Sequence, residues 1–348
     1  MKTKIRYNAI AVFVVCLIVV LYFSIDTKKP IELNSGYHLV MGTFARVVAV
    51  AENSATAQKC IDVALAKINK VDELMSDYKS DSEISELNRE GFKKPIQLSQ
   101  PTYEVLQKSI EFSKLTDGAF DITIGPLVDL FHSAEKNKIV PDKEQIAMTK
   151  SKVGFEKLKL DDLNRTVQFA VEGMRLDLGG IAKGYAVDKA IEAMQNSGAI
   201  GGMVDLGGDI RCFGMPSKGK KHWLIGLQNP NIEKDITSLD VVLKLKLTNG
   251  AIATSGDYQQ YVLIEGKRQS HIMDRSTGKS AEGLSSVTVI SDNATDADAL
   301  ATAVSVIGPE KGLALIEKVP RTEAILITSQ PEYKFIKTTG AEKYIVKE

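Results

Sequence analysis

The sequence contains little cysteine, little histidine and no excess charge of either sign. Three cysteines and four histidines occur in 348 residues, and 44 lysines and arginines balance 44 aspartates and glutamates. So few cysteines exclude a disulfide-rich scaffold, and Cys60 and Cys212, far apart in the body of the chain, define neither a disulfide nor a metal site. The charge balance argues against a dedicated nucleic-acid-binding protein, which usually carries a basic excess.

Long hydrophobic runs are missing apart from one at the N-terminus. Lys2, Lys4 and Arg6 precede an apolar run at residues 9–25, and a charged segment ending at Pro30 follows it. This pattern is typical of a secretory signal or signal anchor, and the run has the minimum length for spanning a bilayer. No small-residue cleavage site follows the run. The run also has no polar face, which argues against a buried helix of a soluble core. We therefore expect residues 1–30 to be an uncleaved anchor in the inner membrane, with the body on the periplasmic, extracytoplasmic side.

The body, residues 31–348, has the composition of an ordinary soluble protein. Over the whole chain 44% of residues are apolar and 25% are charged, which excludes a disordered chain and a polytopic membrane protein. No linker rich in proline and serine follows residue 35, so two lobes, if present, pack closely. The patterns predict an α+β fold with mostly antiparallel strands. Helices are expected at 57–75, from Ser80 to Asn88, at 101–115 and at 295–307. Ser54 is the expected N-cap of the first of these helices, and Ser80 begins a capping box at the start of the second. Strands are expected at 46–50, 239–247 and 286–290 and in a hairpin at 258–273.

A glycine motif occurs twice, as Asp177-Leu178-Gly179-Gly180 and as residues 205–208. The order strand, glycine turn, helix, strand, glycine turn predicts two equivalent turns that face one cavity. Glycines at a helix entry let the backbone approach a ligand, and the helix amides together with Lys183 suit a phosphate. The spacing is neither that of a P-loop nor that of a dinucleotide fingerprint. The alternative interpretation is a tight turn with a surface lysine.

Two further segments carry groups that are common in catalytic sites. Asp298 and Thr302 are four residues apart, so they share one face of a helix, and their oxygens suit Mg²⁺. The alternative is that Thr295 caps this helix and Asp298 is an acid in its first turn. His271 precedes a predicted turn and could act as a base or orient one, although a lone histidine is often structural.

Taken in order, these segments resemble the FAD:protein FMN transferases, the ApbE-type flavin transferases. The resemblance covers about residues 36–330. The motifs that carry it are Met41-Gly42-Thr43, Gly118-Ala119-Phe120-Asp121-Ile122-Thr123, Asp177–Gly184, Asp205–Asp209, Ala253-Thr254-Ser255-Gly256, His271-Ile272-Met273-Asp274 and Ala297–Thr302.

The resemblance implies a reaction, a fold and a set of site residues. The family splits FAD in the presence of Mg²⁺, releases AMP and joins FMN through a phosphoester to a threonine or serine of a target such as a subunit of a membrane redox pump. It implies a flavin groove between two closely packed lobes and assigns catalysis to residues 31–348. Carried over by position, FAD would lie along Met41, Tyr78, Ala119, Phe120, Asp121, Asp177, Lys183 and Ile272.

The same resemblance places the metal and the reacting groups. Mg²⁺ would be held by Gly180, Asp298 and Thr302. Asp177 or His271 would supply a base, and Lys183 would hold phosphate oxygens. Arg275 departs from the family, which usually has proline at this position. Two alternatives use the same residues: a hydrolase that splits FAD to FMN and AMP, and an anchored flavin-binding protein without catalysis.

Overall fold

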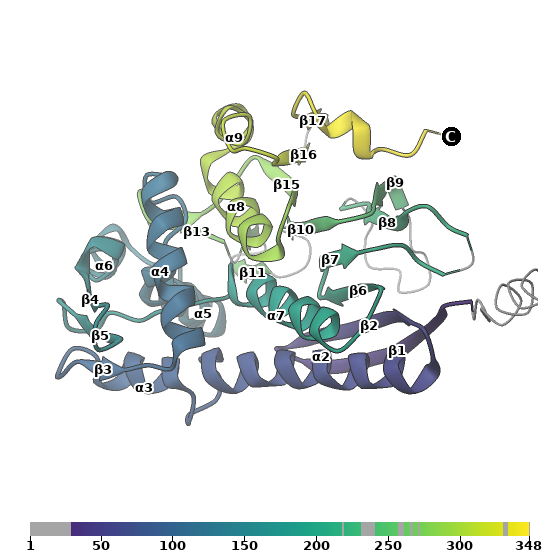
Figure 1. The fold of residues 1–348 in the computed structure, drawn as a ribbon. Helices are drawn as coiled ribbons and strands as arrows, with labels where there is room; N and C mark the ends of the chain where they lie inside the picture. Colours follow the sequence, from purple (N-terminus) through teal and green to yellow (C-terminus); the bar gives the residue numbers. More distant parts are fainter. Residues whose placement is uncertain are drawn as a thin grey trace, which may run out of the picture.

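A computed structural model describes residues 29–217, 219–230, 241–256, 261–264, 267–270, 272–329 and 333–347. Its centre is one eight-stranded sheet in which all pairs are antiparallel (Figure 1). In spatial order its strands are β1 (Ile31–Val40), β2 (Thr43–Ala51), β6 (Gly201–Leu206), β7 (Asp209–Phe213), β10 (Gly250–Gly256), β15 (Leu284–Ser291), β16 (Glu323–Thr328) and β17 (Phe335–Lys337). The predicted α+β class with antiparallel strands is confirmed.

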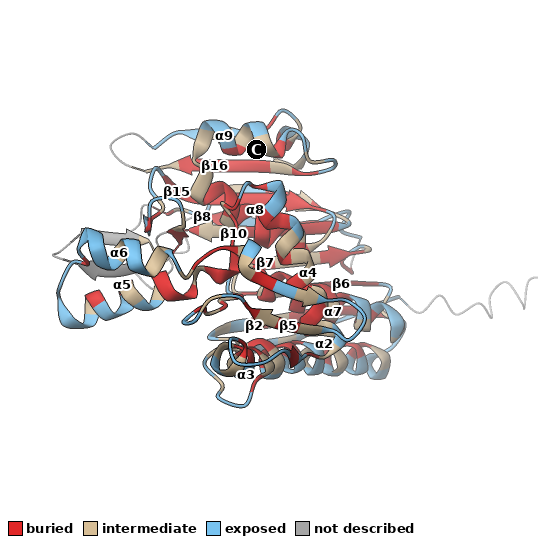
Figure 2. Ribbon diagram, turned by 90° about the vertical axis from the view of Figure 1, so that its left-hand side faces the viewer, coloured by how far each residue is buried: buried red, intermediate tan, exposed pale blue. Residues whose placement is uncertain are grey.

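Helices cover one face of this sheet. Alternate strand residues such as Val47, Ala49 and Val289 join one buried cluster with the apolar faces of these helices, as expected for period-two alternation. Figure 2 shows the buried residues concentrated in the central strands and in α8. The covering helices are α2 (Ser54–Met75), α4 (Gln100–Leu115), α7 (Ala182–Asn196), α8 (Ala294–Ile307) and α9 (Pro309–Ile316).

The opposite face of the sheet has a smaller cover. The two-stranded sheet of β8 (Trp223–Gln228) and β9 (Val241–Leu247) and the short helix η3 (Ala341–Tyr344) form a second cluster with Val48, Val50 and Ile252. Small elements complete the described fold: α3 (Glu83–Glu90), β3 (Ile96–Gln97), η1 (Ile122–Ile124), α5 (Gly125–Asn137), α6 (Lys143–Lys150), η2 (Phe155–Lys157), β4 (Leu158–Asp161), β5 (Thr166–Phe169), β11 (Tyr261–Ile264), β12 (Lys267–Ser270), β13 (Met273–Asp274) and β14 (Lys279–Ser280).

The helix positions predicted from periodicity are confirmed, but two predicted caps are wrong. The cap of α2 is Asn53, whose Oδ1 accepts a hydrogen bond from the Thr56 amide at 2.9 Å, rather than Ser54. The cap of α3 is Ser82 rather than Ser80. In both cases several cap-competent residues are adjacent, and the tertiary contacts of the helix decide which of them begins it.

The predicted membrane anchor cannot be compared with the structure. The apolar run at 9–25 lies outside the described residues. Within the described parts of the chain, which start at residue 29, no helix has both the length and the apolar character needed to cross a bilayer.

The two cysteines of the body are expected to be unreactive in the folded protein. Cys60 lies in the cluster on the helical face and Cys212 in the cluster on the other face, so they do not pair. Burial raises the pKa of both thiols, that of Cys212 to about 12, and only the thiolate is an effective nucleophile. Iodoacetamide at pH 8 should therefore label neither peptide in a mass map until denaturant is added. Rapid labelling of either cysteine without denaturant would contradict the two clusters.

Candidate active site

The first glycine motif forms the entry to α7. Asn88 holds the preceding residue through two bonds, since its side chain donates to the Leu176 carbonyl at 3.0 Å and accepts from the Leu176 amide at 2.7 Å. Asp177 Oδ1 accepts from the Gly179 amide at 2.8 Å and so shapes the turn. The predicted strand before this turn is absent, because residues 174–178 are extended without forming a ladder. The glycine turn and the helix that follows it are confirmed.

A cluster of two buried aspartates and one half-buried lysine joins the two glycine motifs. Lys183, in the first turn of α7, donates to Asp209, the first residue of β7 directly after the second motif. The Lys183 ammonium also lies 3.7 Å from Asp298 Oδ1 in α8. Asp298 is 3% exposed and accepts from the Gly184 amide at 3.0 Å through its other oxygen. The helix after the first motif and the strand after the second therefore meet at one charged cluster, but the two turns are not equivalent, since Gly207 and Gly208 have positive φ and Gly179 and Gly180 do not.

The electrostatics of this cluster follow from its composition, which is one ammonium and two carboxylates. Burial and, after it, the nearby Asp209 raise the pKa of Asp298 to about 7, against the smaller lowering effect of Lys183. Burial disfavours the charged form of Lys183, but Asp209 and Asp298 outweigh this effect and raise its pKa. The cluster therefore carries excess negative charge that a divalent cation could neutralise.

Gly180 and Thr302 lie beside this cluster. A Cβ atom placed on Gly180 would be 2.8 Å from Thr302 Oγ1, and one placed on Gly184 would be 2.3 Å from the Ala294 carbonyl oxygen. The absence of side chains at these two glycines allows the α7 entry to pack directly against α8. The structure thus brings together Gly180, Asp298 and Thr302, the three residues predicted to hold a metal. Their backbone, carboxylate and hydroxyl oxygens form a donor set that suits a hard cation such as Mg²⁺.

The competing interpretation of Asp298 as a capping acid is wrong. The cap of α8 is Asn293, whose side chain accepts from the Asp296 amide. Thr295 donates instead to Asp188 of α7, which also accepts from the Ala294 amide at 2.8 Å. Asp298 therefore does not cap α8, and its carboxylate contacts Lys183 and the Gly184 amide instead.

The Gly118–Asp121 segment forms a second, separately stabilised part of the candidate site. Phe120 is buried and packs edge-to-face on Phe112, and Ala119 is half-buried. Asp121 accepts four hydrogen bonds, from the amide and hydroxyl of Thr123, the amide of Phe155 and the guanidinium of Arg275. All the acceptor positions of this carboxylate are occupied within the protein. Asp121 thus organises the loop around it.

The other predicted flavin-binding residues lie on separate elements. Met41, in the β1–β2 turn, has φ of +51° and is followed by Gly42 at +68°, which is the backbone of a tight two-residue hairpin. Tyr78 is 91% exposed, and its hydroxyl lies within electrostatic range of Asp77 and Asp177. Ile272 is buried at the base of the β13–β14 hairpin. His271, the predicted base or orienting residue, lies outside the described residues.

Two site residues were not assigned from the sequence. Asp209 was part of a quoted motif, but its pairing with Lys183 depends on the approach of β7 to α7. Asp188 is 6% exposed and also accepts from Arg211 at 2.8 Å, so it ties α7, β7 and the start of α8 together. A single aspartate in the middle of a helix gives no sequence signal for this role.

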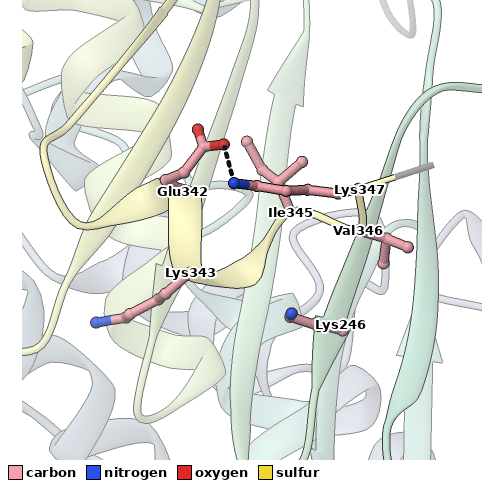
Figure 3. Close-up of a pocket in the computed structure, with 6 residues that line it drawn as sticks. All are labelled: Lys246, Glu342, Lys343, Ile345, Val346 and Lys347. Carbon is pink, nitrogen blue, oxygen red and sulfur yellow. Dashed lines mark ion pairs between the residues drawn. The ribbon is translucent and has the colours of Figure 1, made fainter.

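A separate hollow lies on the other face of the sheet. It has a volume of about 470 Å³ and is bordered by β9 and the C-terminal segment, where Lys347 lies 4.0 Å from Glu342 (Figure 3). Its lining residues are Lys246, Glu342, Lys343, Ile345, Val346 and Lys347. None of them was predicted to bind or catalyse, and the hollow is on the side of the sheet away from α7 and α8.

The fold and the site together define a class: an α+β protein in which a glycine turn at a helix N-terminus lies beside a half-buried lysine and oxygen donors that suit a cation. The sequence profile of the ApbE family matches residues 41–326. The chain belongs to the ApbE family.

Individual relatives agree with this assignment. The chain is 32% identical to the FAD:protein FMN transferase of Vibrio cholerae over 92% of its own length and 95% of the relative, and 35% identical to that of Haemophilus influenzae over 84% and 85%. Among solved structures it is similar to the ApbE protein of Thermotoga maritima, with a TM-score of 0.80, 30% identity and coverage of 92% and 100%. The flavin transferase ApbE of Vibrio cholerae gives a TM-score of 0.76 at 28% identity, covering 90% of this chain and 99% of that one.

Proposed function

We propose that this chain is an FAD:protein FMN transferase that requires Mg²⁺. It would attack the pyrophosphate of FAD with a threonine or serine hydroxyl of an acceptor protein, form a phosphoester to FMN and release AMP. The observation that carries this proposal is the meeting of Gly180, Asp298 and Thr302 beside Lys183 at the entry of α7. The names of its relatives, at 32% and 35% identity over most of the chain, support the same activity.

The donor set supports a resident metal. Gly180, Asp298 and Thr302 would hold Mg²⁺, which would polarise a phosphate oxygen and neutralise developing charge. The excess negative charge of the Asp209–Lys183–Asp298 cluster fits this role, since an added cation relieves the mutual repulsion of the two carboxylates.

The protein's own groups would position and stabilise the reacting phosphates. Lys183 and the Gly180 amide would bind phosphate oxygens, because preorganised donors stabilise charge that develops in the transition state. The attacking hydroxyl needs a base, and Asp177 and His271 remain the two candidates. Asp177 already accepts from the Gly179 amide, so its carboxylate is held at the turn.

The flavin would occupy a groove between two lobes of the protein. In this proposal FAD lies along Met41, Tyr78, Ile272, Lys183 and the Ala119–Asp121 loop. Because Asp121 is saturated by internal hydrogen bonds, we expect it to act through the shape of its loop rather than through a free carboxylate.

The acceptor and the location remain proposals from the sequence. The N-terminal run would anchor the chain in the inner membrane and hold the catalytic body outside the cytoplasm. An acceptor that is a subunit of a membrane redox pump would be within reach of an enzyme anchored in this way.

The activity can be tested with full-length chain in detergent, FAD, Mg²⁺ and a small acceptor domain that carries a candidate threonine. Intact-mass spectrometry of the acceptor should show one added FMN residue, and a chelator should prevent the addition. Free FMN and AMP without an adduct would favour the hydrolase. Intact FAD with several acceptors would contradict the transferase and favour simple binding.

A further inference from the structure

We propose that Arg275 is a positioning residue for FAD, which fastens the β13–β14 hairpin onto the Gly118–Asp121 loop. This inference rests on the proposed function, which places Ile272 and residues 119–121 on the flavin. The hairpin carries Ile272 at its base, where the Ile272 carbonyl accepts from the Ala281 amide at 2.8 Å. The two segments are far apart in sequence, so their relative position depends on side-chain contacts between them.

Arg275 makes such contacts with Asp121 and Gly118 of the loop and with the neighbouring residues 155 and 156. Its guanidinium donates to Asp121 Oδ2 at 2.7 Å and to Glu156 at 3.2 Å, and it lies 5.1 Å from the centre of the Phe155 ring. The Asp121 side chain is 1% exposed, whereas that of Glu156 is 55% exposed. Because a buried ion pair is screened less than an exposed one, the bond to Asp121 is the stronger of the two.

The absence of a side chain at Gly118 leaves space for the Arg275 guanidinium. The φ of Gly118 is +77°, and a Cβ atom placed on this residue would be 2.4 Å from Arg275 Nε. The arginine therefore lies directly on the backbone of the loop, between Gly118 and the Phe155 ring. The contact therefore depends on the absence of a side chain at Gly118, which a pair of surface charges would not require.

The rest of the hairpin is supported independently of Arg275. Met273 is buried in a cluster with Leu127, Phe131 and Val153, and Lys150 of α6 donates to the Ser276 carbonyl. Loss of Arg275 should therefore leave the hairpin folded and attached to α5 and α6. It should free the contact between the hairpin and the Gly118–Asp121 loop, and it also removes the charged partner of the buried Asp121 carboxylate, so the variant is expected to be less stable as well.

The expected consequence is weaker FAD binding with nearly unchanged chemistry. A hydrogen bond between charged groups that holds the loop in its binding-competent arrangement changes the population of that arrangement by about tenfold, so FAD binding should weaken by about the same factor. In Arg275→Ala the KM for FAD should rise by that factor while kcat changes little, because Lys183 and Asp298 lie on other elements. Hydrogen exchange should accelerate at the amides of Phe120 and Ala281 and not in α7 or α8.

Three variants separate positioning from general stability. Arg275→Lys keeps the charge and should recover part of the FAD affinity, and it also serves if Arg275→Ala does not fold. Glu156→Gln removes only the charge of the exposed partner and should behave like the wild type. Arg321→Ala removes an exposed arginine that pairs with Asp292 at 2.7 Å on the surface, and it controls for the loss of one positive charge.

Wild-type binding of FAD is measured first, by quenching of flavin fluorescence. If the wild type does not bind FAD, the proposed function fails, and the inference about Arg275 fails with it. If the wild type binds FAD and Arg275→Ala has the same KM and the same exchange at Phe120 and Ala281, the proposed function stands and only the role of Arg275 is overturned. Equal effects of Arg275→Ala and Glu156→Gln would also overturn it, because the exposed Arg275–Glu156 pair, and not the buried bond to Asp121, would then hold the hairpin on the loop.

Discussion

Asp298→Asn is expected to abolish flavin transfer while the protein remains folded. The variant loses the only charged group among the three proposed metal ligands, and metal assistance contributes several kcal/mol to such reactions, so the rate should fall by about a thousandfold or more. The amide oxygen of asparagine can still accept from the Gly184 amide, which preserves the contact between α7 and α8. Transfer measured by acceptor mass at saturating Mg²⁺ tests the loss.

The stability of this variant is predicted from the pKa of Asp298. Burial and Asp209 raise that pKa to about 7, so the wild-type protein loses stability as the pH rises from the ordinary aspartate pKa of about 3.9 towards 7. A neutral asparagine does not suffer this loss. In EDTA at pH 8 the free energy of unfolding of the variant should not be lower than that of the wild type.

Addition of Mg²⁺ gives a readout that is independent of activity. It should raise the melting temperature of the wild type and not that of Asp298→Asn, because a ligand stabilises only the state that binds it. Asp296→Asn is the matched control, because Asp296 lies in the same helix and pairs with Lys108 at 3.7 Å. This variant should keep both the transfer activity and the rise in melting temperature with Mg²⁺. Full Mg²⁺-dependent transfer by Asp298→Asn would refute the metal site.

Lys183→Met is expected to lower both the activity and the stability. The substitution leaves Asp209, which is 1% exposed, buried without its ammonium partner. Breaking a buried pair from one side costs about 3–5 kcal/mol. Loss of a preorganised donor to the reacting phosphates should lower the transfer rate by about 10²- to 10³-fold. Urea unfolding in EDTA and the acceptor-mass assay measure the two effects separately.

The pH dependence and a double variant identify the cause. With Lys183 gone, the largest influence that lowers the pKa of the buried Asp209 is lost and this pKa rises further, so the stability deficit should be small near pH 4 and increase towards pH 7. Adding Asp209→Asn to Lys183→Met should recover most of the stability and none of the activity. A deficit that is independent of pH, or recovery of transfer in the double variant, would be incompatible with the proposed roles of Lys183.

Much of the fold could be predicted because its signals are local. The apolar spacing of three and four predicted α2, and the helices predicted at 101–115 and 295–307 agree with α4, which has Pro101 in its first turn, and with α8, which ends before Gly308 and Pro309. Period-two alternation predicted β9. Where neighbouring residues offered equal local chemistry, as at the caps of α2 and α3, the sequence pattern selected the wrong one.

In the candidate site too, the sequence indicates which residues are present and the tertiary structure decides which of them meet. The sequence alone determined the chemistry available: the repeated glycine motif, the lysine that follows its first copy and the Asp298–Thr302 spacing on one helical face. It also determined the anchor-like N-terminus, which lies outside the described residues.

Only the tertiary structure decided which of these groups meet. The pairing of Lys183 with Asp209, the bonds of Phe155 and Arg275 to Asp121 and the contact of Arg275 with Gly118 join residues separated by 26 to 157 positions. Such contacts depend on how the strands are ordered in the sheet and how closely α7 approaches α8. The physical reason is that periodicity and propensity act over a few residues, whereas the pairing of buried charges is settled by the packing of distant elements against one another.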